Sequence, residues 1–260
     1  MERSETFDRR RFCRYFSHEA KKTVREQGMF ILLASLVPAM LFLFYWTMSL
    51  LMEGPDEKMN LWSSLPIIKI IIAAITFVLF FLIFPILRYG HLTSRTDGRE
   101  DIMQPVSGLE KFLSMILICI ITVPLAFMAI YFSTDLIFTQ ITPGSDIPLI
   151  QGLAGKGFFG VQEGYYSIDN VYIFFYPYMI SSAGLAGGLL FKKHKIAFTF
   201  LTCVISFILF YSIVLNTVIL KDSQPFDVAK YIVPVWSTIQ TTVAVICCTY
   251  VWTRIKSIQL

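Results

Sequence analysis

The chain has 260 residues, of which 55% are hydrophobic and 15% are charged, and its formal net charge is +4. Soluble domains are usually about 45–50% apolar and about 25% charged, so the composition argues against one. The apolar residues also gather into long runs, which is typical of a membrane protein rather than of a large buried core.

Residues 1–27 are expected to form a basic amphipathic segment at the membrane surface. Eight Lys and Arg residues lie in this segment. Phe12, Tyr15, Phe16 and Val24 fall near helical spacing on one side, as in helices that lie along a bilayer. A disordered basic tail is the alternative interpretation. No cleavable signal is expected, because the first apolar run is too long for the hydrophobic region of a signal peptide.

Six apolar runs follow, and each is close to the roughly 20 residues needed to cross a hydrocarbon core of about 30 Å. Backbone polar groups in lipid must be satisfied within the segment, so each run is expected to be a helix. The expected spans are 28–52, 66–87, 112–134, 171–191, 196–220 and 231–253. Together they form a transmembrane domain of residues 28–254, and a short tail follows at 255–260. Residues 192–195 predict a tight hairpin between the fourth and fifth spans.

The distribution of Lys and Arg predicts the orientation. Seventeen of the 22 lie in the amino-terminal segment and in residues 88–111, 192–195 and 254–260, and five lie on the other side. The more basic side of a membrane protein is cytoplasmic. With six spans, both termini are then cytoplasmic, which completes the prediction of an all-α integral membrane protein.

Small residues and prolines mark two features inside the spans. Gly184, Gly187 and Gly188 lie in the fourth span, where small residues let helix backbones approach closely. This pattern has two interpretations, packing within the bundle or an interface between subunits.

Prolines in membrane helices often mark kinks. The prolines concerned are Pro38, Pro85, Pro124, Pro177 and Pro234.

The residues that catalysis would need are not evident. The span interiors are expected to lack Asp, Glu, Lys, Arg and His, which argues against an ion-coupled carrier or a proton relay. The three histidines and five cysteines show neither metal-ligand spacing nor a disulfide framework. No phosphate-binding loop is present. We therefore expect no catalytic, cofactor or metal site, no enzyme, and no nucleic-acid partner.

The segment 88–111 is the most informative polar stretch. Ser107 is followed three residues later by Glu110, which predicts a capping box at the start of the third span. A short helix near 95–104 is expected at the membrane surface, where it would meet a partner.

This segment resembles the first cytoplasmic loop of ABC-2 type transporter permeases. The matching residues are Glu100, the step Pro105-Val106-Ser107 and the run 109–113, in a form similar to membrane proteins of Bacteroidetes-type bacteria. The basic helix at 7–25 is similar to the family's elbow helix. The resemblance implies that the loop couples to an ATPase, with charges for this contact at Arg95, Asp97, Arg99, Glu100 and Asp101.

The resemblance further implies a permease subunit in a bacterial inner membrane. Its partners would be a cytosolic ATP-binding-cassette ATPase and a second permease, either a copy of itself or a different chain. Because the spans are expected to carry no charge, the substrate is expected to be apolar or amphipathic and to be exported. One departure from the family is that the outer stretch 217–232 is short and the outer loop 135–170 is larger. The alternative is a membrane scaffold or assembly subunit without transport activity.

Overall fold

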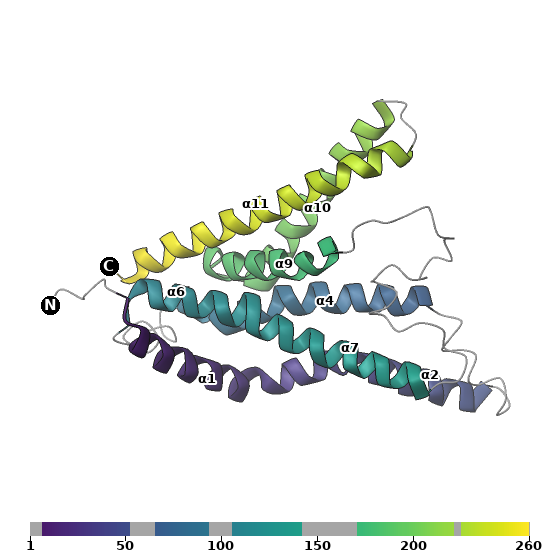
Figure 1. Cartoon of the computed structure of the whole chain (residues 1–260), viewed down its shortest axis with the longest axis horizontal. Helices are drawn as coiled ribbons and strands as arrows, with labels where there is room; N and C mark the ends of the chain where they lie inside the picture. Colours follow the sequence, from purple (N-terminus) through teal and green to yellow (C-terminus); the bar gives the residue numbers. More distant parts are fainter. Residues whose placement is uncertain (1–6, 53–65, 94–105, 142–170, 221–224, 260) are drawn as a thin grey trace. The chain divides into compact units, whose positions relative to one another are not determined.

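The computed structural model describes residues 7–52, 66–93, 106–141, 171–220 and 225–259, and it assigns no strand among them. The elements in chain order are α1 (Arg9–Ser35), α2 (Val37–Met52), α4 (Pro66–Tyr89), η1 (Gly90–Thr93), α6 (Gly108–Ile116), the π-helical turn η2 (Leu117–Thr122), α7 (Val123–Ile141), α9 (Val171–Leu190), α10 (Lys195–Leu220) and α11 (Pro225–Gln259) (Figure 1). The all-α prediction is confirmed for this part of the chain.

All six predicted apolar runs lie on helices. The bounds of α4, α9 and α10 agree with the predicted ranges to within two residues, and the turn between α9 and α10 is the expected short connection. Two other helical stretches are longer than predicted: Gly108–Ile141 is continuous over 34 residues, and α11 has 35 residues. Polar residues can continue a helix beyond the hydrocarbon region, so hydropathy locates the span better than the helix end.

Two helical stretches of the described residues, Ile71–Thr93 and Gly108–Ile141, are long and apolar enough to cross a membrane. A third possible span is the pair formed by Arg9–Ser35 and Val37–Phe44, which are bent by 42° relative to each other. These helices have the length and composition of membrane-spanning segments.

The helix α1 runs without a break across residues 27 and 28, where the sequence suggested a change from surface segment to span. The break lies instead at Leu36, two residues before Pro38, which is in the first turn of α2. A change in side-chain polarity does not interrupt backbone hydrogen bonds, whereas Pro38 has no N–H to donate to the carbonyl of Ala34, at the end of α1.

Proline also coincides with the π-helical turn. Pro124 cannot donate to the carbonyl of Ile120, and the turn Leu117–Thr122 ends two residues before it. A π-turn shifts the hydrogen-bond register by one residue and so accommodates the missing donor. The chain remains helical through Pro85, Pro177 and Pro234.

The chain divides into two compact units, which we describe separately. One comprises residues 23–80 and 122–174, and the other comprises residues 1–22, 81–121 and 175–260. In the first unit the core is aromatic. Phe80 stacks on Phe127 with ring centroids 4.0 Å apart, and Phe42 of α2 stacks on Phe138 of α7 at 4.7 Å.

The first unit also corrects the expectation of spans without charge. Lys69 of α4 lies inside the predicted second span, and Asp135 lies inside the helical stretch Gly108–Ile141; both are buried. The two groups interact electrostatically. Charged residues at a membrane-helix end can face the protein interior when they are paired, and a hydropathy profile does not register this pairing.

In the second unit, the glycines of α9 pack against neighbouring helices. A Cβ atom on Gly184 would lie 2.5 Å from the backbone oxygen of Leu82 in α4, and one on Gly188 would lie 3.3 Å from the Cα of Ile86. Gly187 faces Thr199 of α10. Of the two interpretations of these glycines, the contacts support packing within the bundle.

Candidate functional site: an ion-paired junction of α1, α4 and α6

The side chain of Glu110 joins the amino-terminal ends of two helices. Its carboxylate accepts hydrogen bonds from the backbone N–H of Ser107 (3.0 Å), just before α6, and of Asp8 (2.9 Å), just before α1. The Ser107 hydroxyl in turn accepts from the Glu110 N–H, so the predicted capping box is confirmed. A negative charge is favourable at a helix amino terminus. Here one carboxylate accepts hydrogen bonds from backbone N–H groups at the amino termini of both α1 and α6.

Arg11, in the first turn of α1, completes the surroundings of this carboxylate. Its Nε donates to both Glu110 oxygens, at 3.1 and 2.9 Å, and its Nη2 donates to one of them at 2.8 Å. The Glu110 side chain is fully buried, whereas that of Arg11 is one-third exposed. Hydrogen bonding to Glu110 raises the pKa of the Arg11 guanidinium above its usual value. The multidentate geometry fixes α1 to the start of α6.

A second ion pair fixes α1 to the end of α4. The Nη2 of Arg88 lies 2.6 Å from the Glu19 carboxylate, and both side chains are almost completely buried. Arg88 also lies over the ring of Tyr89, 5.3 Å from its centroid. Glu19 is eight residues after Arg11, or about 12 Å along the helix, so the two pairs lie about two turns apart.

A third contact holds the turn that follows α4. The Nζ of Lys195, the first residue of α10, donates to the Gly90 carbonyl and to the Thr93 hydroxyl, the latter at 2.6 Å. Burial lowers the pKa of this lysine from its usual value. The α9–α10 hairpin is thereby fixed to η1, whose last residue is Thr93.

These contacts surround the ends of one segment. Residues 94–105 begin directly after η1 and end just before Val106 and Ser107. Arg88 and Lys195 anchor the side where the segment starts, and Glu110 anchors the side where it ends. Both Arg88 and Glu110 are paired with α1. A displacement of either end therefore acts on α1 as well as on α4 or α6.

The predicted coupling residues are only partly described. Arg95, Asp97, Arg99, Glu100, Asp101 and Pro105 lie outside the described residues. Val106 is buried, and Ser107 is the N-cap of α6. No group of three or more His, Cys, Asp or Glu side chains that could hold a metal occurs in the part of the chain that the structure describes.

The ion pairs themselves were not predicted. In the sequence, Arg88 contributes to the charge distribution, and Glu110 contributes to the capping box and to the run 109–113; neither pattern predicts an ion pair. A signal for Glu19 does exist, since it follows Tyr15 by four residues on the face of α1 that also carries Thr23. All three side chains are buried, so an acid at this position required a buried partner.

Comparison with known proteins adds no assignment: no family model matches the chain, and neither a curated protein nor a solved structure matches it.

Proposed function

We propose that this chain is the membrane-spanning permease subunit of an ABC-2-like transporter. It crosses a bacterial inner membrane six times with both termini in the cytoplasm, and a separate cytosolic ATPase drives it. The order of the helices and the bias of Lys and Arg toward one side support this topology. The resemblance of residues 100–113 to the family's first cytoplasmic loop supports the assignment.

The observation that carries the proposal is the anchoring of the helix ends on either side of residues 94–105. These ends are joined through α1 by the pairs Glu19–Arg88 and Arg11–Glu110. An ATPase that binds this segment differently before and after ATP hydrolysis would shift the equilibrium between two arrangements of the helices. The charges at Arg95, Asp97, Arg99, Glu100 and Asp101 provide the contact surface for the ATPase.

A second permease chain, identical or different, completes the transporter, and the substrate is apolar or amphipathic and is exported. The helix surfaces support such a substrate, because the exposed side chains on the described spans are largely Leu, Ile, Val, Phe and Met. The buried charges Lys69 and Asp135 interact electrostatically with each other, which argues against their forming a path for ions.

The test is purification of the full chain from its native cells in mild detergent, followed by mass spectrometry of the proteins that accompany it. We expect an ATP-binding-cassette ATPase in stoichiometric amounts. Glu100→Lys should release that ATPase, whereas Glu26→Lys, at an exposed position on α1, should not.

Two results would overturn the proposal. One is purification without any ATPase together with unchanged function of Glu100→Ala and Glu100→Lys. The other is a bound ATPase whose ATP hydrolysis supports no efflux from reconstituted vesicles, which would favour the scaffold.

A further inference from the structure

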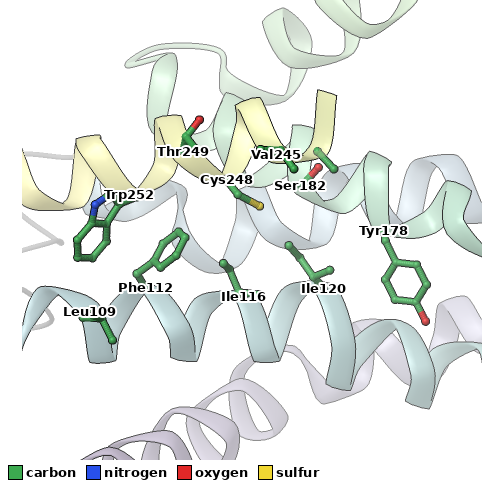
Figure 2. A pocket seen from close by; sticks show the side chains of 11 residues that line it. Leu109, Phe112, Ile116, Ile120, Tyr178, Ser182, Val245, Cys248, Thr249 and Trp252 are labelled. Carbon is green, nitrogen blue, oxygen red and sulfur yellow. The ribbon is translucent and has the colours of Figure 1, made fainter. Parts of the chain in front are cut away.

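An elongated apolar groove runs between α6, η2, α9 and α11, all within the second compact unit. Its volume is about 520 Å³, and its lining is almost entirely apolar. One wall is a single stripe of α6 and η2, formed by Leu109, Phe112, Ile116 and Ile120 (Figure 2). The opposite wall is α11, from which the Cys248 side chain points into the groove.

The length of the groove corresponds to one leaflet of a bilayer. Leu109 and Ile120 are eleven residues apart on a helical stretch, which is about 16 Å at 1.5 Å per residue. Half of a hydrocarbon core of about 30 Å is about 15 Å. The groove therefore has the length of one acyl chain of a membrane lipid.

The two ends of the groove differ in chemistry. At one end Phe112 of α6 contacts Trp252 of α11, with ring centroids 5.3 Å apart, and Leu109 lies beside them. The next turn of α11 carries Arg254 and Lys256. Tryptophan is enriched at membrane interfaces, and basic residues just beyond it attract anionic lipid headgroups. This end therefore suits a headgroup, and the interior suits its chain.

We infer that the groove holds one acyl chain of an anionic phospholipid from the leaflet nearest the start of α6, with the headgroup at Arg254 and Lys256. The inference rests on the part of the proposed function that places these helices in a bilayer, and it does not require transport. The acyl chain would lie along α6 and η2 beside the contact of Phe112 with Trp252, so the bound lipid is a structural element of this helix interface.

The test uses the full chain reconstituted in vesicles of phosphatidylethanolamine and phosphatidylglycerol. A phosphatidylglycerol with a diazirine on one acyl chain is activated by light, and the cross-linked residues are mapped by mass spectrometry. Labelling should occur at Leu109 or Trp252 when the diazirine is near the headgroup. It should move to Ile120 or Tyr178 when the diazirine is near the chain end.

A matched pair of variants adds a second measurement. Cys248→Trp places a large side chain in the groove, whereas Ile246→Trp places it on an exposed face of the same helix. Labelling of the groove residues should fall about tenfold in Cys248→Trp, the factor equivalent to about 1.4 kcal/mol, and should persist in Ile246→Trp. The elution profile of each variant checks that it is folded.

Several outcomes would overturn the inference. The inference would be overturned if the same residues of the wild-type protein were labelled whatever the position of the diazirine on the acyl chain. This result does not depend on whether Cys248→Trp folds. Efficient cross-linking of Cys248 to Cys248 between two chains by a short bismaleimide, with no lipid labelling, would show that a second copy occupies the groove. Failure of the chain to float with the vesicles would instead contradict the membrane topology.

Discussion

The Glu19 carboxylate and the Arg88 guanidinium lie 2.6 Å apart, and neither side chain is more than 3% exposed. Removing one member of a buried ion pair leaves the other charge without compensation, which typically costs 3–5 kcal/mol. We expect Glu19→Gln to lower the free energy of unfolding by about that amount. Thermal unfolding in detergent micelles would show this as a large drop in melting temperature.

Two comparisons separate the ion pair from a general effect of mutating α1. Glu26→Gln, at an exposed position of the same helix, should change stability by about 0.5 kcal/mol or less. The double variant Glu19→Leu with Arg88→Met should recover much of the loss, because it leaves no buried charge unpaired. If Glu19→Gln were as mild as Glu26→Gln, the buried pair would not stabilise the junction.

A second prediction concerns the carboxylate that joins two helix ends. Glu110→Gln keeps the size of the side chain but removes its charge, so the hydrogen bonds from Arg11, Asp8 and Ser107 lose their charge assistance. Hydrogen bonds to charged groups contribute about 1.5–3 kcal/mol, so we expect a loss of about 2–3 kcal/mol for the variant. Hydrogen exchange should show faster opening of the first turns of both α1 and α6.

The matched control for this site is a pair of neighbouring arginines. Arg11→Gln removes the partner of Glu110, whereas Arg10→Gln changes an exposed residue with the same loss of charge. Arg11→Gln should increase exchange at both helix ends, and Arg10→Gln should not. Equal effects of the two variants would mean that overall charge matters rather than the contact.

Local features of the sequence predicted much of this fold. The six apolar runs all lie on helices of the described residues, as expected for runs long enough to satisfy their backbone groups within the segment. The capping box was predictable because Ser107 and Glu110 act within one turn of chain. The short α9–α10 connection was predictable because few residues separate two apolar runs.

Contacts between distant segments could not be read in the same way. Glu19 and Arg88 are 69 residues apart, and Arg11 and Glu110 are 99 apart, so no spacing rule connects them. Counting charges placed Lys69 and Arg88 on opposite sides of the membrane, but it could not show that both side chains are buried. The bend at Leu36 agrees with the kink expected at Pro38, but the boundary at residue 27 was wrong because polarity, rather than backbone hydrogen bonding, set it.

The glycines of α9 give a third prediction. Gly184→Ala would place a methyl group 2.5 Å from the Leu82 carbonyl oxygen, and that oxygen belongs to backbone that cannot easily move. The helices α4 and α9 must then separate, so we expect a loss of about 1–3 kcal/mol, as for other overpacked positions. The melting temperature of the purified protein would measure it.

Gly28→Ala is the control for that change. Gly28 is also inside a helix, but a Cβ there would meet only Val24 at 3.6 Å, an ordinary contact. Alanine favours helix over glycine, so this variant should be neutral or more stable by up to about 1 kcal/mol. Destabilisation by Gly28→Ala to the same extent as by Gly184→Ala would contradict the close-approach explanation.

The native cysteines allow a test of the orientation. Cys13 is exposed near the start of α1, whereas Cys119 is buried and the remaining three are less accessible than Cys13. In the proposed topology Cys13 faces the cytoplasm, so a membrane-impermeant maleimide should label it in inverted vesicles but not in intact cells. Lys156→Cys in a Cys13→Ser background should show the opposite pattern, since residue 156 is proposed to be outside. Labelling of Cys13 from outside intact cells would reverse the assignment of every loop, including segment 94–105, and the ATPase could then not reach that segment.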